Sequence, residues 1–74
     1  MRNLIGKNVR IGKECRIINS VIFDDVIIQD KCVIENCILA RNCHVESEVT
    51  LDECVVKMGS TVSEKSKVSR DSYL

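Results

Sequence analysis

The stretch that decides the fold is IFDDVIIQDKCVIENCIL, residues 22–39. Its regularly spaced aliphatic residues are Ile22, Ile28, Ile34 and Leu39, so the steps between them are six, six and five. An amphipathic helix would instead place apolar residues at i, i+3, i+4 and i+7. The pattern therefore indicates short strands joined by tight turns, with a repeat of 17 residues.

The same repeat extends in both directions along the chain. Twelve positions fall into three columns that contain only Ile, Leu or Val. The columns are Ile5, Ile22, Leu39 and Val56; Ile11, Ile28, Val45 and Val62; and Ile17, Ile34, Leu51 and Val68. Self-similarity at a fixed period is the signature of a repeat architecture. We predict an all-β fold, a parallel β-helix shaped as a triangular prism, with coils about 4.8 Å apart.

This prediction makes residues 1–74 a single domain of about four coils, approximately 5–21, 22–38, 39–55 and 56–72. A second column set, mostly small residues, follows the aliphatic columns and includes all five cysteines. We expect these small residues at the corners, where the interior narrows. Polar turn residues such as Gly6-Lys7-Asn8 and Asp24-Asp25 lie between the strands. Gly6, Gly12 and Gly59 are expected where the backbone is crowded.

Composition excludes several classes of function. The chain has 74 residues, with eleven basic and eleven acidic side chains, so no field of one sign attracts nucleic acid or a membrane. Phe23 and Tyr73 are the only aromatic residues. No apolar run is long enough for a signal peptide or a transmembrane helix, and the cysteine count is odd. We therefore expect a cytoplasmic protein with reduced thiols.

The hexapeptides at residues 5–10 and 11–16 resemble those of left-handed parallel β-helix proteins. The segments at 19–22, 36–39 and 53–56 are similar to the C-terminal repeats of the gamma subunit family of eukaryotic translation initiation factor 2B. The epsilon subunit and GDP-mannose pyrophosphorylase carry related repeats. The left-handedness is implied by the resemblance and not by the period. Those families carry an N-terminal nucleotidyltransferase-like domain, to which nothing in these residues corresponds.

The resemblance implies an assembly or scaffold domain of a guanine-nucleotide exchange complex, with no catalytic role and no cofactor. It also implies the epsilon subunit as a protein partner. One alternative is the C-terminal oligomerisation or regulatory tail of a sugar-nucleotide pyrophosphorylase. A fragment of an acyltransferase trimer is another alternative, but that class needs a protruding loop and the unbroken repeat argues against one.

The cysteines and the single histidine carry the remaining chemistry. Cys32, Cys37, Cys43 and His44 do not have the paired short spacing of a zinc site, so we predict no metal site. Cysteine is expected here as a small buried hydrophobic residue, although stacked pairs lie close enough to be bridged in principle. His44 precedes an inward-facing residue, so we expect it on the surface and not as a general base.

The outward positions of one predicted face are almost entirely apolar. We predict that this face binds a partner protein or a preceding domain through Leu4, Val21, Phe23, Ile38, Ala40 and Val55. The competing interpretation is that the short turn places this column partly inside the prism. Both ends of a coil stack would expose apolar residues and unpaired backbone. We expect another chain or domain over the first coil, and residues 70–74 over the last.

Overall fold

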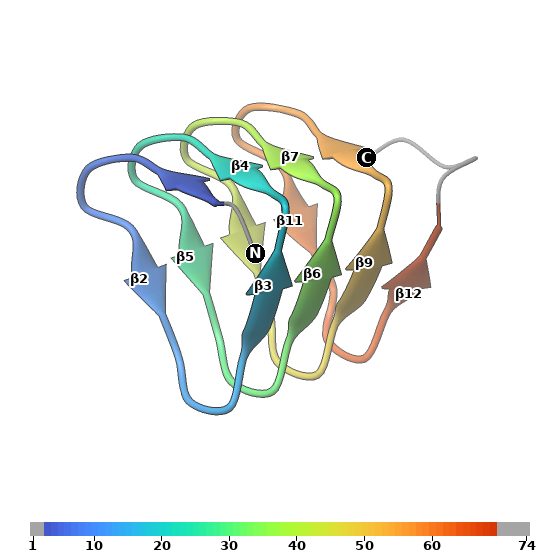
Figure 1. The fold of residues 1–74 in the computed structure, drawn as a ribbon. Coiled ribbons are helices and arrows are strands. Elements are labelled where there is room, and N and C mark those ends of the chain that lie inside the picture. The colour runs from blue at the N-terminus through green and yellow to red at the C-terminus, as the bar shows by residue number, and fades with distance from the viewer. Residues whose placement is uncertain (1–2, 70–74) are drawn as a thin grey trace.

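The computed structural model describes residues 3–69, which form three parallel sheets and no helix. The first sheet contains β1 (Leu4–Ile5), β4 (Val21–Ile22), β7 (Ile38–Leu39) and β10 (Val55–Val56). The second contains β2 (Arg10–Ile11), β5 (Ile27–Ile28), β8 (His44–Val45) and β11 (Thr61–Val62). The third contains β3 (Arg16–Ile18), β6 (Val33–Glu35), β9 (Thr50–Asp52) and β12 (Lys67–Val68). The chain visits the three sheets in turn (Figure 1).

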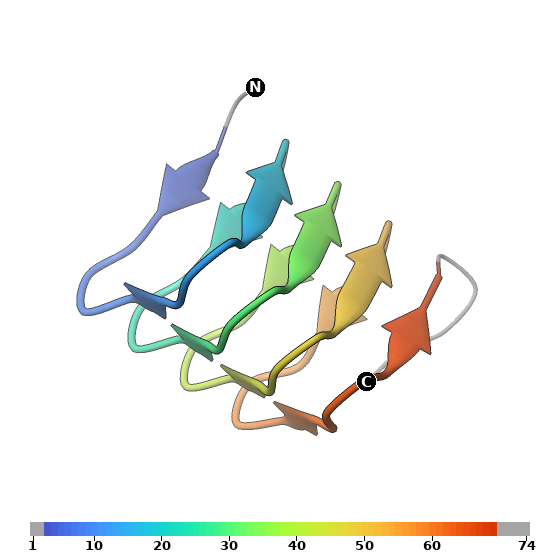
Figure 2. The same ribbon diagram turned by 90° about the horizontal axis from the view of Figure 1, so that it is seen from below.

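Each strand pairs in parallel with the strand 17 residues away. Ile22, for example, is in register with Ile5 on one side and Leu39 on the other. The coils therefore stack side by side as a four-turn β-helix (Figure 2). The aliphatic columns face inward and, with the small residues at the corners, form one continuous core. The predicted all-β architecture, its parallel strands and its 17-residue repeat are confirmed.

The corners are hydrogen-bonded as regularly as the strands. One residue at each corner has a positive φ, as in Asn8 (58°), Asp25 (62°) and Lys31 (60°). This left-handed conformation turns the N–H group along the stack axis, where it reaches a carbonyl of the preceding coil. The Asp25 N–H donates to the Lys7 carbonyl at 2.9 Å, and the Lys31 N–H to that of Lys13 at 2.8 Å. The turns therefore belong to the backbone ladder.

The small corner side chains also form hydrogen bonds, which the sequence did not indicate. The Ser20 hydroxyl donates to the Ile18 carbonyl at 2.9 Å and accepts the Cys37 N–H at 3.2 Å. The Cys43 thiol donates to the Lys57 carbonyl at 2.9 Å, although the column contains valine one coil earlier, at Val26. The interpretation of cysteine as simply a small hydrophobic residue is therefore incomplete, because the thiols are also weak donors.

Two of the three glycines are required by close approach of the next coil. A Cβ at Gly6 would lie 2.9 Å from the Asp24 backbone nitrogen and closer still to the Asp24 carboxylate, which accepts the Lys7 N–H at 2.8 Å. Gly12 has the same relation to Asp30. The expectation of crowding at Gly59 is wrong: no atom lies within 4 Å of a Cβ there, and its φ of 74° is the reason for glycine.

The first coil differs from the others in burial. Ile5 and Ile11 belong to the inward-facing columns, yet they are 49% and 40% exposed. The expectation that every column residue is interior is wrong for these two, because no described coil precedes theirs. In the last coil, Val56 and Val62 are buried. The predicted cap over that coil, residues 70–74, lies outside the described residues, as does the predicted end of the fourth coil.

Candidate partner-binding face

The outer surface of the first sheet carries the largest group of exposed apolar side chains. Leu4 is 70% exposed, Phe23 47%, Ile38 43% and Val55 39%. The register places Leu4, Val21, Ile38 and Val55 on successive rungs of β1, β4, β7 and β10. We call Leu4, Val21, Phe23, Ile38, Ala40 and Val55 the apolar face.

The apolar face is not uniformly exposed. Val21 and Ala40 are half-buried, and Ala40 packs against the core. The competing interpretation, that the short turn places this column partly inside the prism, therefore applies to these two residues. The other four side chains project into solvent. Four consecutive rungs with exposed aliphatic or aromatic groups make a continuous stripe along the prism, which is the kind of surface that binds other proteins.

A shallow hollow lies at the N-terminal end of this stripe. Its volume is about 260 Å³, and its walls come from β1, β4 and the residues that follow them. Leu4, Phe23 and the exposed Ile5 are among its lining residues. The apolar face therefore continues around the edge of the prism onto the open end of the first coil. An aliphatic or aromatic side chain of a partner would fit this hollow.

The other two sheets present mixed outer surfaces. Ile27 on β5 is exposed, but its neighbours in register are Arg10 and His44. On the third sheet, Arg16 and Glu35 approach to 3.9 Å in an exposed ion pair, which contributes little to stability. Polar and charged groups thus interrupt the apolar residues on these sheets, and the first sheet is the surface suited to apolar docking.

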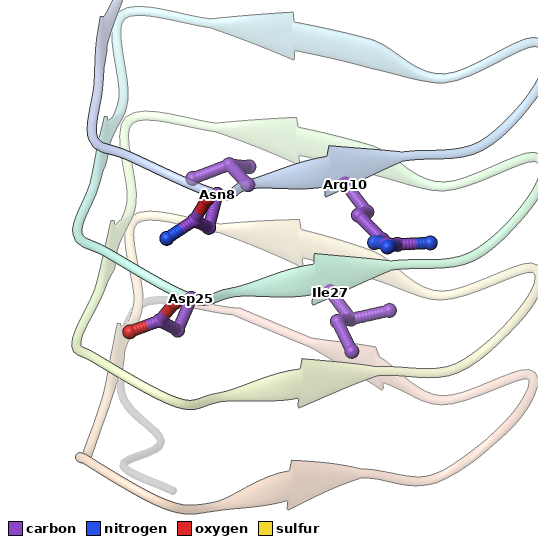
Figure 3. A pocket seen from close by; sticks show the side chains of 5 residues that line it. Asn8, Arg10, Asp25 and Ile27 are labelled. Atoms are coloured by element: carbon purple, nitrogen blue, oxygen red, sulfur yellow. The ribbon is translucent and has the colours of Figure 1, made fainter.

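A second hollow, of about 440 Å³, lies at the corner between the first two coils (Figure 3). Asn8 and Asp25 lie one above the other on its wall, and Arg10 lies beside Ile27. Asn8 and Asp25 are the left-handed corner residues of their coils. One carboxylate, one amide and one guanidinium along an open surface do not make a nucleophile with an adjacent base.

His44 is half-buried on β8 and lies beside polar side chains. Its Nε2 atom is 3.0 Å from the Gln29 amide nitrogen, and the Gln29 amide oxygen accepts a hydrogen bond from the Ser47 hydroxyl at 3.2 Å. These contacts hold the imidazole against an amide and not against a carboxylate that would orient a general base. The expectation of a freely solvated histidine is corrected to a half-buried, hydrogen-bonded one.

The five cysteines are free thiols, four of them buried and Cys15 half-buried. Burial raises the pKa of the Cys32, Cys37 and Cys43 thiols above the ordinary value of 9.0. Within residues 3–69, no group of three or more His, Cys, Asp or Glu side chains is placed to hold a metal ion. The same residues contain no helix capable of crossing a membrane.

Comparison with known proteins places these observations in a family. The family model described as "EIF2B subunit epsilon LbH domain", where LbH denotes a left-handed β-helix, matches residues 1–71. No curated protein matches the chain. The matched model is that of the epsilon subunit, so the sequence-based preference for the gamma subunit is not confirmed, while the hexapeptide-repeat β-helix class is. With nearly its whole length matched, the chain belongs to the family of EIF2B epsilon left-handed β-helix domains.

Proposed function

We propose that this chain is a non-catalytic assembly domain of a cytoplasmic, EIF2B-type guanine-nucleotide exchange complex. Membership in the EIF2B family supports a place in a multi-subunit complex. The observation that carries the proposal is the apolar face, with Leu4, Phe23, Ile38 and Val55 exposed along one sheet. In this role the β-helix presents a rigid surface, and another subunit buries it.

The partner in this proposal is a second repeat-bearing subunit of the same complex. The gamma resemblance implied the epsilon subunit as partner, whereas the family match makes the chain itself epsilon-like. We therefore propose pairing between the epsilon and gamma types, with this chain on the epsilon side. Burial of four exposed aliphatic or aromatic side chains favours such pairing at about 25 cal/mol for each Å² removed from water.

The test is binding to purified gamma and epsilon subunits, assayed separately, by analytical ultracentrifugation. Ile38→Glu places a charge in the centre of the apolar face. Ile27→Glu is the matched control, because Ile27 is 40% exposed against 43% for Ile38 but lies on the second sheet. We expect Ile38→Glu to abolish binding to the gamma subunit and Ile27→Glu to leave it unchanged, with both variants retaining the circular dichroism of the wild type.

Other outcomes would contradict the proposal in different ways. Unchanged binding in Ile38→Glu would mean that the apolar face is not the interface, and equal loss in both variants would mean that the loss is not specific to that face. Binding to the epsilon subunit alone would reverse the assignment and restore the gamma type. Self-association without binding to either subunit would instead fit the oligomerisation tail of a sugar-nucleotide pyrophosphorylase.

A further inference from the structure

Cys15 and Cys32 lie on adjacent rungs at the same corner of the prism. Each directly precedes a strand of the third sheet, β3 and β6 respectively. The Arg16 N–H donates to the Cys32 carbonyl at 2.8 Å, which ties the two backbones together beside the thiols. Neighbouring strands lie about 4.8 Å apart, and disulfide-linked cysteines have Cα atoms about 4.4–6.8 Å apart. The backbone spacing therefore falls in the range for a disulfide.

The two side chains point in the same direction. The Cys15 thiol donates to the Gln29 carbonyl at 3.0 Å, and the Cys32 thiol donates to the Glu46 carbonyl, one coil further, also at 3.0 Å. Identical hydrogen bonds one repeat apart place one sulfur above the other. Their proximity has a second sign: burial raises the pKa of the Cys32 thiol, and the neighbouring Cys15 thiol raises it further.

The two thiols differ in access to solvent. Cys15 is half-buried, whereas Cys32 has no exposed surface. Among the described strands, β3 pairs only with β6, while β6 pairs with both β3 and β9. Within the described residues the backbone ladder therefore holds the strand that follows Cys15 on one side only. A small oxidant can therefore contact the Cys15 thiol from solvent, whereas the Cys32 thiol is accessible only to the Cys15 side chain.

Cys37 and Cys54 provide an internal comparison. They also lie one coil apart, and the Cys54 N–H donates to the Cys37 sulfur at 3.4 Å. Both are buried, however, and they precede strands β7 and β10. Among the described strands β10 pairs only with β7, just as β3 pairs only with β6, so burial and not strand pairing distinguishes Cys37 and Cys54 from Cys15 and Cys32. This second stacked pair therefore has similar spacing without access for an oxidant.

We propose that Cys15 and Cys32 form a hydroperoxide-responsive dithiol, whose disulfide fastens the first coil to the second. The Cys15 thiolate attacks the peroxide oxygen, which gives a sulfenic acid and releases an alcohol or, from hydrogen peroxide, water. The Cys32 sulfur then displaces the sulfenic hydroxyl, and the Cys32 proton leaves with it as water. Two thiols and one hydroperoxide thus become one disulfide, and an external thiol reductant restores both cysteines.

The experiment treats the full chain with hydrogen peroxide, blocks the remaining thiols by alkylation under denaturing conditions, and maps the cysteines by mass spectrometry. Cleavage after basic residues together with cleavage after Glu35 separates Cys32 from Cys37, which otherwise share a peptide. Because cleavage after glutamate also occurs at Glu14, we expect a linked pair of peptides, 15–16 with 32–35. The pair is lighter by two hydrogen atoms than the sum of the two free peptides, and a reductant separates it. Sulfinic acid at Cys15 with Cys32 still alkylated would overturn the proposal, as would equal bridging of Cys37 and Cys54.

Two variants sharpen the result, and each takes its replacement from its own column. Cys32→Val copies Val49, and we expect it to lose the bridge and to accumulate sulfenic acid at Cys15, detectable with a dimedone probe. Cys37→Ser copies Ser20, and we expect it to keep the bridge unchanged. Loss of the bridge in Cys37→Ser would overturn the proposal. Peptide mapping of the wild type decides the matter even where a variant does not fold.

Discussion

The first and second coils are built from the same repeat, yet their aliphatic residues lie in different environments. Ile5 and Ile11 are 49% and 40% exposed, whereas Ile22 and Ile28, in the same columns, are each only 1% exposed. The difference is in the neighbours: among the described strands β1 and β2 each pair on one side, while β4 and β5 pair on both. The first coil therefore buries its aliphatic residues less than the second. In the last coil Val56 and Val62 are buried even though β10 and β11 also pair on one side only, so the two ends of the described stack differ.

The largest expected change in the free energy of unfolding comes from truncating residues of one aliphatic column, Ile11 in the first coil and Ile28 in the second. We expect Ile28→Ala to reduce the free energy of unfolding by about 3 kcal/mol, because it leaves a cavity among buried side chains. Ile11→Ala removes a side chain that is already partly in water, so we expect a loss of about 1 kcal/mol. Urea unfolding followed by circular dichroism measures both, and equal losses would contradict the comparison.

Glycine substitutions in the first and last coils should destabilise for different reasons. We expect Gly6→Ala to cost about 2 kcal/mol, because its Cβ would press on Asp24 of the next coil. We expect Gly59→Ala to cost about 1 kcal/mol through its left-handed φ alone.

Asparagine separates these two causes, since it tolerates the left-handed conformation. Gly59→Asn should recover most of the stability lost in Gly59→Ala, while Gly6→Asn should recover none. Thermal unfolding of the four variants is the measurement. Recovery at Gly6 would show that Asp24 is not the source of the cost.

The buried thiols of the inner coils should make stability sensitive to alkaline pH. Burial raises the pKa of the Cys32, Cys37 and Cys43 thiols in the folded state, so above the ordinary value of 9.0 the folded chain binds more protons than the unfolded chain. Stability is then fully present below pH 9 and decreases as the pH rises above it. Urea unfolding at pH 7, 9 and 10 tests this. Cys43→Val should flatten the decrease, and an unchanged profile in that variant would contradict the assignment.

The smallest expected change in the free energy of unfolding comes from replacing a corner residue that has a positive φ. This change should be the same in every coil, because the strain is local to the corner. Glu14 and Glu48 hold the left-handed φ at equivalent corners of the first and third coils, at 59° and 60°. We expect either glutamate to asparagine change to raise the free energy of unfolding by about 0.5 kcal/mol. The reciprocal Asn42→Glu should lower it by a similar amount. A gain in one coil and not the other would mean that corner strain depends on the neighbouring coils after all.

The sequence was sufficient to locate the aliphatic columns and the turns between strands, because the positions of both are set by local pattern. The column from Ile22 to Val56 can be identified from the spacing of aliphatic residues alone. Asn8 and Asp25 can be recognised as turn residues from their residue type. The exposure of Ile5 could not be read from its own repeat, because that exposure depends on which coils are adjacent. The thiol hydrogen bonds were missed because Cys43 and Val26 occupy one column, and spacing does not distinguish donors from apolar groups.

The candidate site was predictable in outline and not in detail. Alternation along each strand placed Leu4, Ile38 and Val55 outward, as the structure has them. The partial burial of Val21 and Ala40 depends on how their neighbours pack around the short corner, which no pattern states. Every β-helix of this kind needs aliphatic residues at its inward positions. The repeat is therefore common to the epsilon and gamma types, and it did not separate one from the other.

The in-register pairing of residue i with residue i+17 has a consequence for how such a domain can change over evolution. A gene segment that encodes residues 22–38 could be duplicated or deleted as a unit, and the flanking coils would meet in the same register. The prism would become longer or shorter while its cross-section, corners and stripe of outward side chains stayed aligned. Length is therefore the dimension in which this architecture can vary without redesign of its core.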